Sequence, residues 1–341
     1  MPPRLIDKSM LTPEMVLRTD ILSASGAVLV PRGIVLTEDL IKGIKRFPHV
    51  HTLEIDDKRE SEQEKFLRKS FEVKEESVKH LILSISDGNP VDQQIVEDTV
   101  NGIQKDFSMT SDVLACMRKV NDIDSYTYRH SLNVSMLAML MGRWLKMTEA
   151  QSKDLATAGL LHDIGKSKIS KNILLKEGAL TPEEYEEVKK HSTYSYRLLQ
   201  EDKLSKEILM GILMHHERED GSGYPLGAKG DQIPLYGKIL AVCDVYSAMV
   251  SMRPYKGRQN PFVVIKEMLA NYKGKLDYGL MHTLFYNVAM SHVHEYVLLN
   301  TGEIGQIAFI NPREVLRPIV RIDTVLVDLQ QEHSLEIEDI L

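Results

Sequence analysis

The spacing of apolar residues changes twice along the chain, and each change predicts a different kind of structure. In the first 60 residues, short apolar runs of strand length, such as Val28–Val30, lie close to turn residues. From about residue 64 to residue 290, apolar residues recur three and four positions apart, the spacing of helices that bury one face. Beyond residue 295, runs such as Tyr296–Leu299 and Val320–Val327 again indicate strands. We therefore expect a mainly α fold.

We expect four segments along the chain. They are a small α+β N-terminal module (1–60), a helical connector (61–109), a multi-helix domain (110–294) and a small C-terminal β subdomain (295–341). Dense mixed charge in residues 56–76 predicts a solvated connector, although a seam between two copies, and so a homodimer, stays open. Within the helical domain, Thr181 as cap and Pro182 at the first position predict a helix start.

Composition narrows the class of protein without naming a function. Of 341 residues, 43% are hydrophobic and 27% are charged, as in soluble globular proteins. No apolar run approaches the ~18 residues of a membrane span, and the N-terminus lacks the apolar stretch of a signal peptide. Cys116 and Cys243 lie in apolar helical patterns and are expected to be reduced, which favours a cytoplasmic protein. The net charge of −7 argues against DNA binding, so a phosphate-bearing substrate would need a local positive site.

Seven histidines and aspartates lie at or near the ends of predicted helices. They are His130, His162, Asp163, His191, His215, His216 and Asp244. Five imidazoles and two carboxylates suffice for two transition-metal ions that share a bridging carboxylate and keep positions open for water and substrate. After the His162-Asp163 pair, Gly165 lets the backbone turn tightly and Lys166 offers a positive charge to an anion.

The stretches around these residues resemble the HD-GYP phosphodiesterases of the HD hydrolase superfamily. The resemblance covers about residues 110–290 and includes Leu161–Lys166 and His215–Pro225. The second stretch has the distinctive pattern His-His-Glu-x-x-Asp-Gly-x-Gly-Tyr-Pro. The resemblance implies an HD-type helical bundle that carries a dinuclear metal site.

The resemblance also implies which ion each ligand would hold. The first ion would be bound by His130, His162, Asp163 and Asp244, and the second by Asp163 as a bridge, His191, His215 and His216. Some members hold a third ion with a glutamate, but Tyr126 stands at that position here, so two ions are expected. Iron or manganese is the implied metal, and the ligand types would also accept zinc. Ser247 stands where many members carry an aspartate near the substrate.

The resemblance also implies substrate contacts near this centre. Asp163 and Lys166 would be catalytic, and the substrate-binding residues would be Lys166, Arg253, Tyr255 and Lys256. Arginine can grip a phosphate with two hydrogen bonds, whereas lysine acts as a compact charge. The loop residues are Gly221, Gly223, Tyr224 and Pro225, which are expected to form a tight turn directly after the His-His pair. In the family this loop is linked to substrate access and to partners, often diguanylate cyclase domain proteins.

The implied activity is hydrolysis of cyclic di-GMP to linear pGpG, with further hydrolysis to GMP left open. A hydroxide held between two divalent ions would attack phosphorus in line with the departing oxygen. One alternative is a catalytically silent receptor for the nucleotide, but degenerate members lose ligands and all seven are present here. Another is an HD hydrolase for a nucleoside triphosphate or an alarmone, which would not need the extra histidines. A third is a phosphodiesterase for another cyclic dinucleotide, such as cyclic GMP-AMP.

Overall fold

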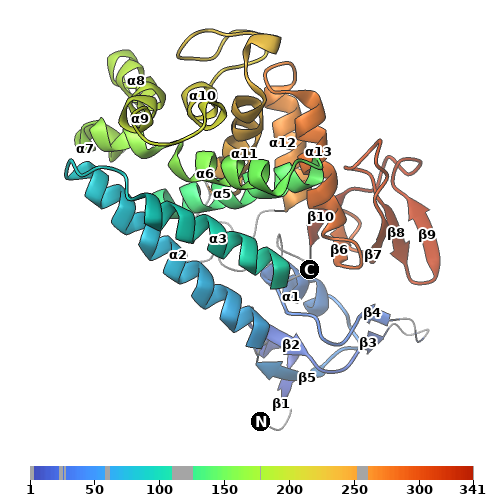
Figure 1. The fold of residues 1–341 in the computed structure, drawn as a ribbon. Coiled ribbons are helices and arrows are strands. Elements are labelled where there is room, and N and C mark those ends of the chain that lie inside the picture. Colours follow the sequence, from blue (N-terminus) through green and yellow to red (C-terminus); the bar gives the residue numbers. More distant parts are fainter. Residues whose placement is uncertain are drawn as a thin grey trace. The chain divides into compact units, whose positions relative to one another are not determined.

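The computed structural model describes residues 4–22, 26, 28–57, 62–109, 126–176, 178–251 and 260–340 (Figure 1). The chain forms two compact units. One contains Met1–Glu62, Asn260–Ile265 and Val288–Leu341, and the other contains Gln63–Gln259 and Lys266–Asn287. Helices dominate, and the small sheets are built from the two ends of the chain. The expected mainly α fold is confirmed.

The N-terminal part of the first unit contains a three-stranded antiparallel sheet in the order β1-β5-β2. Between β2 and β5 in the sequence, β3 and β4 pair as a two-stranded antiparallel ribbon. The strands are β1 (Arg4–Asp7), β2 (Met15–Leu17), β3 (Ile21–Leu22), β4 (Val28–Val30) and β5 (Thr52–Asp57). Helix α1 (Glu38–Lys45) starts at Thr37, whose hydroxyl accepts from the Leu40 N–H. Its residues Leu40 and Ile44 pack with Leu17 and Ile55 in a buried apolar cluster.

The C-terminal part of this unit is a five-stranded antiparallel sheet in the order β10-β6-β7-β8-β9. The strands are β6 (Tyr296–Leu299), β7 (Ile304–Phe309), β8 (Ile319–Ile322), β9 (Val325–Asp328) and β10 (Ile337–Ile340). The run Val320–Val327 is a hairpin, because Asp323 adopts a left-handed φ of 51° and reverses the chain before Val325 pairs with Ile322. Ile304 packs against the apolar cluster of the N-terminal sheet.

The second unit is helical. Among the described residues its α-helices, three of which extend into the first unit, are α2 (Glu62–Ser86), α3 (Gln93–Met109), α5 (Tyr126–Trp144), α6 (Glu149–Leu161), α7 (Lys171–Leu174), α8 (Pro182–Lys189), α9 (His191–Leu199), α10 (Lys206–Met214), α11 (Leu235–Ser251), α12 (Pro261–Tyr272) and α13 (Tyr278–Met290). The predicted helix start at Thr181 is confirmed, since its hydroxyl and the Glu184 carboxylate close a capping box around Pro182. None of the described helices combines the length and apolar character that crossing a bilayer requires.

Helices α5, α6, α10 and α11 pack together and form the core around which the site is built. Residues of α5 from Leu132 to Met141 are all buried, and so is the centre of α11 around Cys243, whose thiol forms no disulfide. Cys116 lies outside the described residues. These two helices therefore place their polar positions, including His130 and Asp244, against a rigid apolar background.

Helix α2 is not solvated along its whole length, although its mixed charge suggested so. Lys74 is buried and its Nζ lies 2.8 Å from Asp106 Oδ2 of α3. The next residue, Glu75, accepts from Arg129 of α5 at 3.1 Å, with both side chains largely buried. Since Arg129 directly precedes His130, this ion pair ties the connector to a helix of the predicted site. Removing one partner of such a buried pair leaves an uncompensated charge.

Candidate metal centre

The structure brings all seven predicted ligands together. His130 comes from α5 and Asp244 from α11. His162 and Asp163 follow the last residue of α6, His191 begins α9, and His215 and His216 follow α10. Their donor atoms form three overlapping groups, each within 4.8 Å: His191 with His215 and His216, His130 with His162 and Asp244, and His162 with Asp163 and His215.

Asp163 lies between the other ligands. Its Oδ2 is 3.3 Å from His162 Nε2, and its Oδ1 is 3.3 Å from His191 Nε2. On the first side, Asp244 Oδ1 lies 3.0 Å from His130 Nε2 and 3.8 Å from His162 Nε2. One oxygen of Asp163 therefore faces each half of the centre, the arrangement that a bridging carboxylate requires.

Three histidine rings are oriented by the helix ends that precede them. Nδ1 of His162 lies 2.8 Å from the Gly159 carbonyl oxygen, Nδ1 of His191 lies 2.7 Å from that of Val188, and Nδ1 of His215 lies 2.6 Å from that of Ile212. Each carbonyl is three residues earlier, among the groups that a helix end leaves without an intrahelical partner. Because a carbonyl only accepts, each Nδ1 donates and each Nε2 presents a lone pair to the centre.

His130 is oriented differently. Its Nδ1 lies 3.2 Å from the hydroxyl of Ser247, one turn along α11 from Asp244. Ser247 is buried. The residue that stands in place of an aspartate in this sequence therefore supports a predicted ligand from behind.

The donor set fits metal ions. Nε2 of His191 lies 3.4 Å from Nε2 of His215, and with both Nδ1 atoms protonated these two nitrogens point lone pairs at each other. His162 Nε2 and Asp163 Oδ1 are buried without a hydrogen-bond partner among the described residues. Such groups cost about 1–3 kcal/mol each when nothing satisfies them. Cations between the rings and the carboxylate would satisfy all four atoms, the three Nε2 nitrogens and the Asp163 oxygen.

Burial and the carboxylates set the protonation of the ligands. Burial lowers the pKa of His191, takes that of His216 well below its usual range, and lowers that of His215 to about 3. Burial also opposes ionisation of Asp163, but His162 and Lys166 outweigh it and hold its pKa well below the ordinary value. These groups are therefore in the forms that bind metal at neutral pH.

This pattern predicts that the metal-free protein loses stability as the pH falls. Unfolded histidines titrate near 6.5, whereas folded His191, His215 and His216 stay neutral below it, so unfolding takes up protons. His162 opposes this only above pH 6.5, because Asp163 outweighs burial and raises the pKa of His162; below that pH it is protonated in both states. Unfolding should then take up about two to three protons, so we expect a loss of about 3–4 kcal/mol per pH unit below pH 6.5.

The measurement is urea unfolding of chelator-treated protein, followed by fluorescence of Trp144. This is the single tryptophan of the chain and it ends α5, so it reports on the unit that holds the site. A free energy of unfolding that stays constant or rises between about pH 7 and pH 5.5 would contradict the prediction.

Lys166 contacts the centre directly. Its Nζ lies 2.6 Å from Asp163 Oδ2, while a third of the side chain, 34%, remains exposed. Lys166 belongs to a short 3-10 helix, η2 (Ile164–Lys168), that follows the His162-Asp163 pair. The other predicted substrate contacts, Arg253, Tyr255 and Lys256, lie outside the described residues. The side chain of Tyr126, which stands where some family members hold a third ion, also lies outside them.

The loop after the His-His pair lies against the centre. The ring of Tyr224 stacks on that of His216 with centroids 4.6 Å apart. Gly221 has a φ of +81°, which glycine adopts without strain. Glu217 and Asp220 form hydrogen bonds within the loop: Glu217 accepts from two backbone N–H groups and Asp220 from Ser222.

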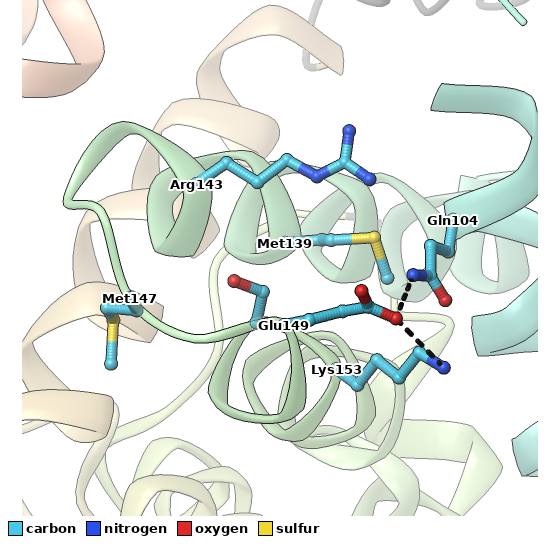
Figure 2. A pocket seen from close by; sticks show the side chains of 7 residues that line it. Gln104, Met139, Arg143, Met147, Glu149 and Lys153 are labelled. Atoms are coloured by element: carbon cyan, nitrogen blue, oxygen red, sulfur yellow. Dashed lines mark hydrogen bonds and ion pairs between the residues drawn. The ribbon is translucent and has the colours of Figure 1, made fainter. Parts of the chain in front are cut away.

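A pocket in this unit is lined by residues other than the predicted ligands. A pocket of about 280 Å³ lies among α3, α5 and α6, where Glu149 bridges Gln104 and Lys153 (Figure 2). Arg143 lines the same pocket. None of the predicted site residues takes part in it, and its one carboxylate is already paired.

Comparison with known proteins places the helical core in a family. Residues 112–280 match the HD domain. The helical core of the chain is therefore an HD domain. The resemblance expected from the sequence is thereby confirmed, and the seven converging residues lie inside the matched region of this HD protein.

Curated relatives of the HD protein are named as phosphodiesterases of cyclic dinucleotides. It is 33% identical over 236 residues to the cyclic di-GMP phosphodiesterase PA4108 of Pseudomonas aeruginosa, covering 69% of this chain and 57% of that one. A cyclic di-GMP phosphodiesterase of Thermotoga maritima is 46% identical over 138 residues, 39% of this chain and 37% of that one. The 3'3'-cGAMP-specific phosphodiesterase 1 of Vibrio cholerae is 32% identical, covering 55% and 43%. The chain spans about half the length of these relatives.

Among solved structures, the fold is similar to that of Bd1817, an HDG"Y"P protein from Bdellovibrio bacteriovorus. The TM-score is 0.53 with 14% sequence identity, over 83% of this chain and 98% of that one. At this identity the likeness shows the fold alone.

Proposed function

We propose that this HD protein is a metal-dependent phosphodiesterase that hydrolyses cyclic di-GMP to linear pGpG. The observation that carries the proposal is the position of Asp163, with one oxygen toward His162 and the other toward His191. A cyclic dinucleotide carries two phosphodiester charges, and its hydrolysis needs both an activated water and neutralisation of the departing oxygen. Two cations that share a carboxylate meet both needs. The names of the relatives support the same substrate class.

Two divalent ions, which we expect to be iron or manganese, would be held by the seven converging residues. The first would take His130, His162, Asp163 and Asp244, and the second Asp163, His191, His215 and His216. When bound, they would supply Lewis acidity that lowers the pKa of water and offsets phosphate charge. The chain itself contributes His191, His215 and His216, whose imidazoles burial keeps neutral, and carboxylates that stay ionised.

We propose that Lys166 binds a nonbridging oxygen of the substrate phosphate. Its ammonium lies at the edge of the centre, paired with Asp163 and still 34% exposed, so it can reach a bound anion without leaving the site. A compact ammonium suits a phosphate oxygen that approaches from solvent. Arg253, Tyr255 and Lys256 remain proposed substrate contacts on the basis of the sequence.

A second substrate has a specific observation in its favour. Relatives named 3'3'-cGAMP-specific phosphodiesterases are 32% to 36% identical to this chain, within the range of the cyclic di-GMP relatives. The metal ligands would not distinguish guanine from adenine, because in the proposed reaction they act at the phosphate. A diguanylate cyclase domain partner, a homodimer and a cytoplasmic location remain predictions of the sequence.

The test is anaerobic purification with metal analysis, followed by product identification on cyclic di-GMP and cyclic GMP-AMP. We expect two ions per chain and conversion of cyclic di-GMP to pGpG that stops after chelation and returns with Mn²⁺ or Fe²⁺. Turnover of cyclic GMP-AMP alone would support the second substrate. Full occupancy of both ions without turnover of either nucleotide would contradict the proposed activity and favour a silent receptor.

A further inference from the structure

The ring of His216 is oriented differently from those of the other four histidines among the predicted ligands. Backbone carbonyls orient three of the rings, and Ser247 orients that of His130. The Nε2 of His216 lies 3.1 Å from His191 Nε2, and its Nδ1 lies 4.0 Å from Asp244 Oδ2, both predicted ligands. Within the described part of the chain, no carbonyl or hydroxyl is hydrogen-bonded to this ring. Its orientation must therefore come from packing.

Two rings pack against that of His216: the ring of His215, with centroids 4.0 Å apart and tilted by 44°, and the ring of Tyr224 from the loop. Tyr224 makes the stacked contact. Its ring stacks on His216 at a centroid distance of 4.6 Å and an interplanar angle of 29°, and meets His191 edge-on at 6.3 Å. The Tyr224 N–H also donates to the His216 carbonyl oxygen at 3.2 Å. On the tyrosine ring, Lys189 Nζ lies 5.9 Å from the centroid, within reach of a cation–π attraction. Aromatic pairs of this kind are worth about 0.5–1.5 kcal/mol beyond their buried area.

The loop that carries Tyr224 is fixed at its base. The buried carboxylate of Glu217 accepts from the Leu226 N–H at 2.6 Å and the Ala228 N–H at 3.0 Å, so the end of the loop is tied to its start. At Gly223 an added Cβ would lie 2.4 Å from Glu217 Cα and 2.5 Å from the His216 carbonyl oxygen. Only glycine lets the two backbone segments approach this closely. The ring of Tyr224 is therefore held over His216 by the loop's own construction.

We propose that Tyr224 is a positioning residue for the second metal site, and that it acts by holding the imidazole of His216 in place. This inference rests on the proposed dinuclear centre and deepens it. The Gly-Tyr-Pro loop then belongs to the metal site itself, because glycine permits the fold-back and tyrosine provides the ring. The tyrosine hydroxyl has no part in this role.

The experiment measures binding of Mn²⁺ to the metal-free full chain, without nucleotide, by equilibrium dialysis and electron paramagnetic resonance. Wild type should bind two Mn²⁺ ions that give the signal of a coupled pair. Tyr224→Phe keeps the ring and should match wild type. Tyr224→Leu should weaken the second ion about 10- to 100-fold and leave the signal of an isolated ion, with the first affinity unchanged.

Tyr185→Leu is the matched control. Tyr185 also lies against Lys189, at 5.4 Å, but is half exposed and makes no ring contact with His216 in the described chain. This variant should bind both ions as wild type does. Loss of the second ion in Tyr185→Leu would overturn the inference, because it would place the effect in Lys189 or in general packing.

A double-mutant cycle separates positioning from simple disruption. In a His216→Ala background, Tyr224→Leu should weaken the second ion less than about 3-fold further, since its partner is already gone. Full additivity, or an unchanged second affinity in Tyr224→Leu alone, would overturn the inference. If Tyr224→Leu does not fold, Glu217→Gln provides the same test through the loop base.

These readouts also separate this inference from the proposed activity. A protein that binds two Mn²⁺ ions with the expected dependence on Tyr224 but hydrolyses no nucleotide would refute the activity and keep the inference. A wild type that binds fewer than two Mn²⁺ ions would overturn the inference.

Discussion

Asp163→Asn is expected to lower cyclic dinucleotide hydrolysis at least about 10³-fold, a loss of roughly 4 kcal/mol of transition-state stabilisation. The amide keeps the shape of the side chain but removes the negative charge and replaces one oxygen with an NH₂ group. That group faces either His162 Nε2 or His191 Nε2, each 3.3 Å away, and cannot bind a cation. At least one ion should therefore be lost, and the other should bind more weakly.

The measurement pairs metal content after dialysis with initial rates on cyclic di-GMP. Asp231→Asn is the matched control, because it makes the same chemical change at an exposed position in η3 (Gly230–Gln232) and should leave both quantities unchanged. Unfolding is monitored by Trp144 fluorescence, so that a folded, metal-depleted variant can be recognised. Two retained ions with a rate within about 10-fold of wild type would refute the bridging role of Asp163.

The convergence of the ligands could be anticipated from their positions at helix ends. His162 and His215 follow the last residues of α6 and α10, and His191 comes directly after Lys190, the cap of α8. At such positions a ring can reach back to an unpaired carbonyl three residues earlier and point its other nitrogen outward. The spacing of apolar residues predicts where helices begin and end, and so it showed that these histidines share a position at helix ends.

The supports around the ligands could not be anticipated in the same way. Ser247 contacts His130 although the two residues are 117 positions apart in the sequence. Tyr224 contacts His216 because the loop between them folds back. Local sequence patterns do not predict contacts of either kind. The buried pair Lys74 and Asp106 was likewise hidden, because a run of mixed charge looks the same whether its members face water or one another. The hairpin within Val320–Val327 was missed because nothing in its apolar spacing marks the left-handed turn at Asp323.

Gly165→Ala is the substitution expected to disturb both stability and metal binding. A Cβ at this position would lie 2.1 Å from the His191 carbonyl oxygen and 2.4 Å from the Ser195 backbone nitrogen. Both are backbone atoms of α9, at its first residue and at its middle, so the clash cannot be relieved by turning a side chain. The Gly165 N–H donates to Ser195 Oγ, which itself donates to the His162 carbonyl oxygen, and these bonds would stretch as well.

The displacement would move His191 away from Asp163. Gly165 lies two residues after Asp163, and His191 is the first residue of α9. Overpacking of this kind costs about 1–3 kcal/mol. The same shift lengthens the 3.3 Å approach of His191 Nε2 to Asp163 Oδ1, so the second Mn²⁺ should bind about 10-fold or more weakly.

Urea unfolding of the metal-free variant by Trp144 fluorescence and Mn²⁺ titration measure the two effects. Gly279→Ala is the control, since an added Cβ in α13 meets only one side-chain oxygen of Asp277 at 3.3 Å and should change stability by less than about 0.5 kcal/mol. If Gly165→Ala were destabilised but bound both ions normally, the close approach would serve packing alone. Because Gly165 packs on His191 and lies two residues from the proposed bridging carboxylate of Asp163, we expect stability and second-ion affinity to fall together.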